Sequence, residues 1–111
     1  MDLKINEIKI GNIILWDGVE YIVKPSFYDQ YENGDTNIKP IPLSVEWLKK
    51  AGYKQLKRIE KTYSLSSFED NSSIYFTGVR FIHIITGTQL DFVHELQNLH
   101  FCLQKQELKF I

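Results

Sequence analysis

The dipeptide Asp17-Gly18 is the feature that most constrains the fold, because it separates two β-prone runs at residues 12–16 and 19–24. Both residues tolerate the positive φ angles of a type I′ turn, so the two runs are predicted to form a hairpin. A two-residue loop also fixes the register. The predicted cross-strand pairs are Trp16 with Val19, Leu15 with Glu20, Ile14 with Tyr21 and Ile13 with Ile22.

Both faces of this hairpin carry apolar side chains. This is typical of a sheet that curls, so residues 1–43 are predicted to form a β-rich half, either a curled antiparallel sheet or an SH3-like partial barrel. Residues 25–37 contain Pro25 and Asn33-Gly34, which are typical of a loop or of a second, weaker hairpin. A short strand is expected near Ile38.

A short helix is predicted from Val45 to Ala51. Pro40 and Pro42 keep the preceding segment extended. Ser44 can then accept a hydrogen bond as N-cap, and Gly52 can end the helix in the left-handed conformation of a Schellman motif.

The second half, residues 44–111, is predicted to add a three-stranded antiparallel meander and a final helix. The strands are expected at 61–65, 73–77 and 79–85, and Thr88 is expected to cap a helix over 89–105. The expected fold class is therefore α+β, with the last helix packed on the sheet and one domain over 1–111.

The final helix has an apolar stripe suited to the meander and a second face that is partly apolar. Either the helix is wedged between the meander and the N-terminal half, or the second face is a docking surface. The side chains of the second face that we consider as protein-binding candidates are His94, Gln97, Asn98 and Phe101. Equally, the polar ones can satisfy backbone groups where the helix meets the N-terminal half.

Composition favours a cytoplasmic chain. The net charge is -1, there is one cysteine, and the charged residues Asp2, Lys4 and Glu7 interrupt any signal-peptide core. No apolar run approaches the length of a membrane span, so no membrane partner is expected.

Neither an enzyme nor a cofactor is indicated. The sequence has no phosphate-binding glycine loop, no nucleophile elbow and no histidine spacing typical of a metal site. Cys102, between Phe101 and Leu103, is more typical of a small hydrophobic residue than of a nucleophile.

Two segments are candidates for binding. Aromatic and acidic residues alternate in the first, which suits protein docking: Phe27, Tyr28, Asp29, Tyr31 and Glu32, followed by Asp35. Cations dominate the second, which suits nucleic acid with help from Tyr53 or Tyr63: Lys49, Lys50, Lys54, Lys57, Arg58 and Lys61.

Three phrases carry a resemblance to a known family: residues 8–12, 38–48 and 93–101. In this order and spacing they resemble a family of short proteins of Bacteroidetes-type bacteria, their prophages and phages. The resemblance covers most of the chain and implies no activity. His94, Gln97 and Asn98 match the family pattern, whereas His100 and Cys102 depart from it, which counts against either as a family-wide catalytic group.

The sequence therefore predicts a small, non-enzymatic binding protein that docks to a host or phage protein and inhibits a host process such as antiviral defence. One alternative is a nucleic-acid-binding accessory domain that uses residues 49–61. The other is an oligomer that binds a nucleotide or another small molecule between its subunits, and self-association is natural for a nearly neutral molecule with separate acidic and basic patches.

Overall fold

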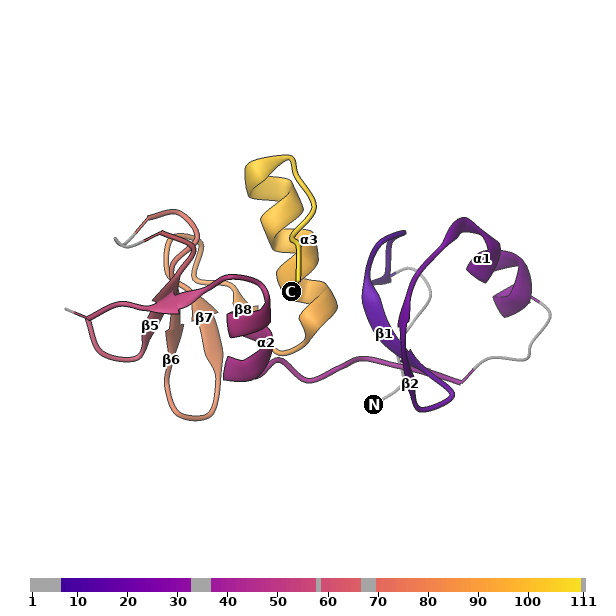
Figure 1. Cartoon of the computed structure of the whole chain (residues 1–111), viewed down its shortest axis with the longest axis horizontal. Coiled ribbons are helices and arrows are strands. Elements are labelled where there is room, and N and C mark those ends of the chain that lie inside the picture. The colour runs from indigo at the N-terminus through magenta and orange to yellow at the C-terminus, as the bar shows by residue number, and fades with distance from the viewer. Residues whose placement is uncertain (1–6, 33–36, 58, 67–69, 111) are drawn as a thin grey trace.

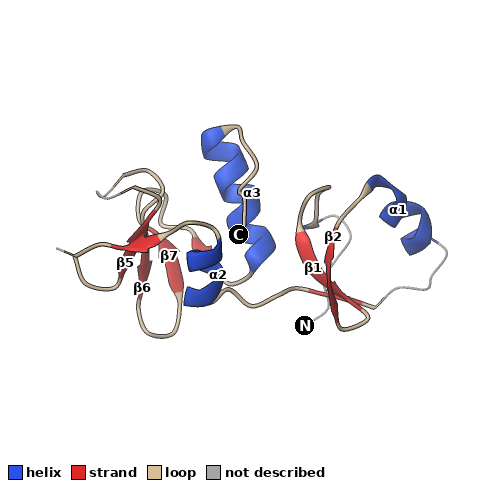
Figure 2. Ribbon diagram, viewed as in Figure 1, coloured by secondary structure: helices blue, strands red, loops and turns tan. Residues whose placement is uncertain are grey.

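A computed structural model of the chain describes residues 7–32, 37–57, 59–66 and 70–110, and within the first helix it describes side chains as far as Tyr28. The fold is α+β, as predicted, with two antiparallel sheets and three helices among the described residues. The two sheets lie at opposite ends of an elongated molecule, and helix α3 stands between them (Figure 1). Figure 2 shows the strands gathered at the two ends.

The predicted hairpin is present. Strands β1 (Ile13–Trp16) and β2 (Val19–Ile22) pair in the expected register, and the turn residues Asp17 and Gly18 have φ angles of 51° and 82°. Both positive angles fit a type I′ turn. Strand β3 (Ile38–Lys39) pairs with the other side of β1, so the order is β2-β1-β3 and β2 lies at an edge.

Helix α1 (Pro25–Glu32) corrects the prediction of a loop or hairpin for residues 25–32, whereas the predicted turn residues Asn33-Gly34 lie outside the described residues. Pro25 occupies the first helical position, where its missing N–H breaks no bond. The helix also buries Phe27 completely against Trp16 and Tyr21, and this aromatic contact is not visible in local sequence. Pro25, which in the sequence is typical of a loop or hairpin, is therefore the start of a helix.

Helix α2 (Val45–Lys50) has both predicted ends. The Ser44 hydroxyl accepts a hydrogen bond from the Trp47 N–H at 3.3 Å. At the other end Gly52 has a φ of 93°, and the Tyr53 N–H donates to the Leu48 carbonyl at 2.9 Å. This is the Schellman arrangement that the sequence predicts.

The second sheet contains the predicted meander, widened by one short strand on each side. Its five strands, in the order β4-β5-β6-β7-β8, are β4 (Lys54–Gln55), β5 (Thr62–Ser64), β6 (Ile74–Phe76), β7 (Phe81–His83) and β8 (Gln89–Leu90).

Helix α3 (Val93–Gln104) begins later than predicted. Leu90 pairs with Phe81 in the sheet, and the Thr88 carbonyl accepts the His83 N–H, so residues 89–90 are strand and Thr88 is no cap. The Glu95 carboxylate accepts the N–H groups of Asp91 at 2.9 Å and Phe92 at 3.0 Å. An acid in the first turn thus satisfies the N–H groups at the helix start.

Two hydrophobic clusters lie on either side of α3. The larger one joins α2, the second sheet and α3 through side chains such as Leu48, Ile74, Val93 and Leu96, and Leu108 ties the C-terminal tail to it. The smaller one fills the space between the first sheet and α1 around Phe27. Ile13 and Leu15 of β1 pack against the larger cluster from the other half.

We predict that Gly52→Ala lowers the free energy of unfolding by about 1 kcal/mol, because an alanine is strained at this positive φ. An added Cβ would meet only Leu65 Cδ2, at an ordinary 3.8 Å, so no clash adds to this cost. Urea denaturation of the two proteins measures the difference. An unchanged midpoint would contradict the assigned helix end.

Candidate functional site

The acidic-aromatic segment does not form the docking loop that the sequence predicts. Phe27 is fully buried, so it is excluded as a binding residue and belongs to the core of the N-terminal half. Tyr28 is half-buried, and its hydroxyl donates to the Ile8 carbonyl at 3.5 Å. The side chains of Asp29, Tyr31 and Glu32, and all of Asp35, lie outside the described residues.

Helix α3 is wedged between the two halves, which is the first of the two predicted arrangements. The Gln97 side chain accepts the Ile13 N–H at 2.8 Å and donates to the Gly11 carbonyl at 2.9 Å. Asn98 accepts a hydrogen bond from the Asn12 amide at 2.8 Å. These polar side chains satisfy groups of the N-terminal half, and buried Gln97 is inaccessible to a partner.

His94 is also buried, which excludes it from a docking surface, and its ring stacks on Phe92. Its Nδ1 atom has no hydrogen-bond partner among the described residues. Burial lowers the pKa of His94, and the opposing charges of Glu95 and Glu7 do not cancel this effect. Burial likewise lowers the pKa of His100, against the charge of Glu107.

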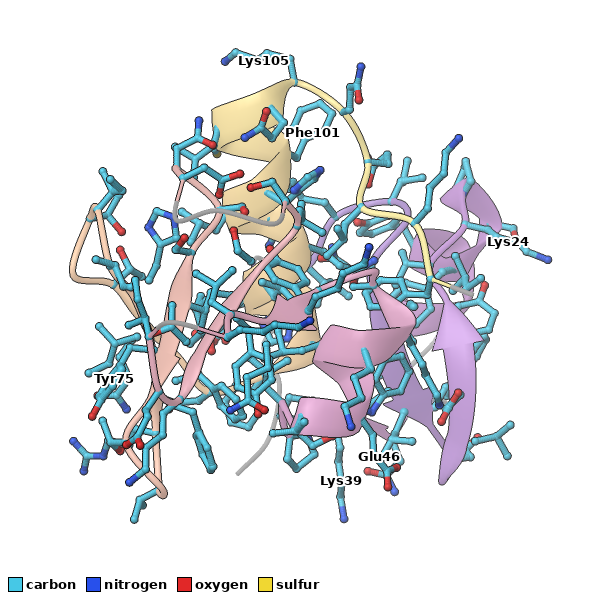
Figure 3. All side chains as sticks on the ribbon, turned by 60° about the vertical axis from the view of Figure 1, so that its left-hand side comes forward. Lys24, Lys39, Glu46, Tyr75, Phe101 and Lys105 are labelled. Atoms are coloured by element: carbon cyan, nitrogen blue, oxygen red, sulfur yellow. The ribbon has the colours of Figure 1, made fainter. Side chains whose placement is uncertain are left out.

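Phe101 is the exposed member of the predicted α3 face, with 38% of its surface accessible. It projects from the last turns of the helix in Figure 3. The Lys9 ammonium group lies 4.9 Å from its ring centroid, a cation–π contact between the two halves. Phe101 therefore stays a candidate contact residue.

The basic segment is exposed but lacks the predicted aromatic neighbours. Tyr53 and Tyr63 are both buried, so neither can stack on a nucleic-acid base. Arg58 lies outside the described residues. The side chains of the five lysines reach solvent: Lys49, Lys50, Lys54, Lys57 and Lys61. The Lys50 ammonium group lies over the Trp47 ring, 4.6 Å from its centroid.

A cluster of hydroxyl groups, not singled out in the sequence, closes the turn between β5 and β6. The Ser64 hydroxyl donates to the Asp70 carboxylate at 2.9 Å, and the Ser72 N–H donates to the same oxygen at 2.8 Å. Burial raises the Asp70 pKa, but hydrogen bonds from serines outweigh burial and hold it below its ordinary value. The arrangement therefore stabilises an ionised carboxylate within a turn.

His83 lies beside this turn with both ring nitrogens engaged. Nε2 donates to the Asn71 carbonyl at 2.6 Å, and Nδ1 lies 2.7 Å from the Thr86 hydroxyl. Such a histidine holds two loops together and has no free nitrogen for a substrate. In the described part of the chain, no three His, Cys, Asp or Glu side chains are grouped to hold a metal ion.

The feature that the sequence did not predict is an open groove of about 320 Å³ where the two halves meet. One wall comes from the first sheet, and the other comes from α2 and the C-terminal tail, which stand near each other in Figure 3. Its lining is largely aromatic and aliphatic: Ile13, Glu20, Tyr21, Ile22, Trp47, Lys50 and Phe110.

The groove combines exposed apolar surface with two opposite charges. Ile22 is 56% exposed, and the rings of Trp47 and Phe110 meet edge to face at 5.5 Å between centroids. The charged side chains Glu20 and Lys50 are both solvent-exposed. The available sequence signal was the hairpin register, which placed apolar Ile22 opposite Ile13, but nothing in the local sequence placed Phe110 near them.

Comparison with known proteins adds no assignment: no family model, no curated protein and no solved structure matches this chain. Among the described helices, none has the length and apolar character needed to span a bilayer.

We predict that Gln97→Ala destabilises the protein by about 2 kcal/mol or more, because it leaves the Ile13 N–H and Gly11 carbonyl without partners. Chemical denaturation measures the loss. Gln104→Ala is the matched control, since Gln104 lies on the same helix and its hydrogen bond to Asn71 is exposed. Equal destabilisation by both substitutions would contradict a bridging role for Gln97.

We also predict that the wild-type protein loses stability as the pH falls from 7 through the ordinary histidine pKa of 6.5. The folded state holds His94 with a lowered pKa, so the unfolded chain binds the proton more readily and gains population below pH 6.5. His94→Phe keeps the stacked ring and should reduce this pH dependence, measured as unfolding free energy between about pH 7.5 and 5.5. An identical slope in both proteins would show that His94 is not responsible.

Proposed function

We propose that this chain is a small, cytoplasmic, non-enzymatic binding protein, and that it docks to another protein through the groove between its two halves. The observation that carries the proposal is the aromatic and aliphatic lining of an open groove beside exposed Ile22. Aromatic side chains that become fully buried on binding contribute most of the affinity in many protein interfaces.

The position of the groove supports this role. Its walls come from elements on either side of α3. The Gln97 bridge ties β1 to α3, and α2 packs in the same hydrophobic cluster as α3. A preformed groove avoids part of the ordering cost of binding. The charges of Glu20 and Lys50 can orient a partner, while the apolar residues contribute affinity.

The sequence resemblance supports a phage-derived role. We propose a host or phage protein as the partner, with inhibition of a host process such as antiviral defence as the outcome. A single cysteine fits a reducing compartment such as the cytoplasm.

We predict that Phe110→Ser weakens partner capture by about 30-fold or more, which corresponds to loss of one dominant aromatic contact. The experiment is capture from nuclease-treated native lysate of a Bacteroidetes-type host by immobilised protein, followed by titration of the captured protein. Phe101→Ser is the matched control because it removes an exposed ring outside the groove. Thermal unfolding confirms that each variant is folded.

A second groove variant guards against instability of Phe110→Ser. Lys50→Glu reverses one of the groove charges at an exposed position and should also weaken capture. Loss of capture by Phe101→Ser alone would move the docking surface to α3. In a parallel capture from lysate that has not been treated with nuclease, recovery of nucleic acid without a protein would overturn the proposal in favour of the basic segment.

A further inference from the structure

Within the part of the chain that the structure describes, strand β2 is an exposed edge of its sheet. It is the outer strand in the order β2-β1-β3, and its residues Val19 and Ile22 are 66% and 56% exposed. Proteins commonly protect such an edge with prolines, lysines, bulges or covering segments, because its free backbone groups can pair with another strand. Within β2 itself there is neither a lysine nor a proline.

The hairpin register determines which backbone groups are free. The two-residue loop makes Trp16 and Val19 a hydrogen-bonded pair, and alternation makes Ile14 and Tyr21 the next one. The Val23 N–H continues this series with its bond to the Asn12 carbonyl at 2.8 Å. The N–H and C=O groups of Glu20 and Ile22 must therefore point away from β1, toward the free edge.

The extended backbone continues beyond β2 to Lys24. Val23 remains paired with the β1 side, and a residue that precedes a proline is held out of the helical region. Lys24 then shares a face with Glu20 and Ile22, because side chains alternate along a strand. Figure 3 shows the exposed Lys24 side chain projecting away from the body of the molecule.

We propose that β2 pairs antiparallel with β2 of a second copy of this chain, about a two-fold axis at Ile22. In this register Ile22 lies opposite Ile22 of the second copy, and each Glu20 lies opposite Lys24 of the other chain. The two sheets of order β2-β1-β3 become one continuous six-stranded sheet. The pairing uses the free groups of Glu20 and Ile22 and removes both edges.

Two neighbouring symmetric registers, with the axis at Glu20 or at Tyr21, give less favourable side-chain pairs. An axis at Glu20 places two carboxylates directly opposite each other, which is destabilising. An axis at Tyr21 places Ile22 against Glu20 of the second copy, so neither side chain has a complementary neighbour. The axis at Ile22 alone gives an apolar pair flanked by two opposite-charge pairs, each of which is stabilising.

This pairing also concerns the groove. Ile22 lines the groove and shares a sheet face with Ile13, so Ile22 of a second copy would extend the same apolar wall. The dimer therefore lengthens the groove rather than filling it. The inference goes beyond the proposed function and does not depend on it, since the strand edge exists whether or not another protein docks.

A charge exchange tests the register directly, with mass measured by sedimentation and light scattering. The wild-type protein is expected to be a dimer, and Glu20→Lys or Lys24→Glu alone should weaken dimerisation by about tenfold or more, because each places like charges opposite each other twice. An equimolar mixture of these two variants should recover dimers, since every pair in the mixed dimer is again of opposite charge. Val79→Lys, at an exposed turn, should leave the dimer unchanged.

Three outcomes would overturn the inference: a monomeric wild-type protein, single-charge variants that remain as dimeric as the wild type, or a mixture that stays monomeric. Each outcome is distinct from failure of the proposed function, because Phe110 and Phe101 lie outside β2. A dimer with no captured protein would support the pairing and contradict the docking role. Capture of a partner protein by a monomeric chain would support the docking role and contradict the pairing.

Discussion

The relative position of the two halves depends on two hydrogen bonds between the Gln97 side chain and the backbone of the N-terminal half. Each half has its own hydrophobic cluster, and among the described residues Ile13 and Leu15 of β1 pack against the cluster of the other half. The amide of Gln97 satisfies one N–H and one C=O at this junction. Because both groups would otherwise lose water without compensation, the contact favours one relative position of the halves.

Local chemistry explains what could be predicted from the sequence. Asp17-Gly18 specifies its turn through backbone angles, and Ser44 with Gly52 specifies both ends of α2, so these elements follow from a few neighbouring residues. The start of α3 did not follow, because pairing of Leu90 with Phe81 overrides a helical pattern that is present in the sequence. Helix α1 was missed because its stabilisation comes from burial of Phe27 beneath the hairpin.

The candidate site was less predictable than the fold. Polar residues on α3 were correctly considered as partners of backbone groups, but the choice between that role and docking required the position of Gly11 and Ile13. The groove combines the first sheet, α2 and the last residues of the tail. Phe110 contacts Trp47, and Leu108 anchors the same tail in the larger cluster. Contacts of this kind depend on tertiary packing, which sequence periodicity does not contain.

Groove and strand edge have a common origin. Among the described residues the N-terminal sheet has three strands, so a single strand on each side of β1 leaves β2 as an outer strand, and the groove opens where this sheet faces α2 and the C-terminal tail. The small size of the half thus leaves polar backbone and apolar side chains accessible in the same place.

The division of the aromatic residues has a spectroscopic consequence. Trp16 packs in the cluster around Phe27, and Trp47 packs at the edge of the larger cluster, so each half contains one of the two tryptophans. Replacing either indole by phenylalanine leaves an intrinsic fluorophore in one half only. Coincidence or separation of the two emission transitions during unfolding would then report how strongly the halves are coupled energetically, without any added label.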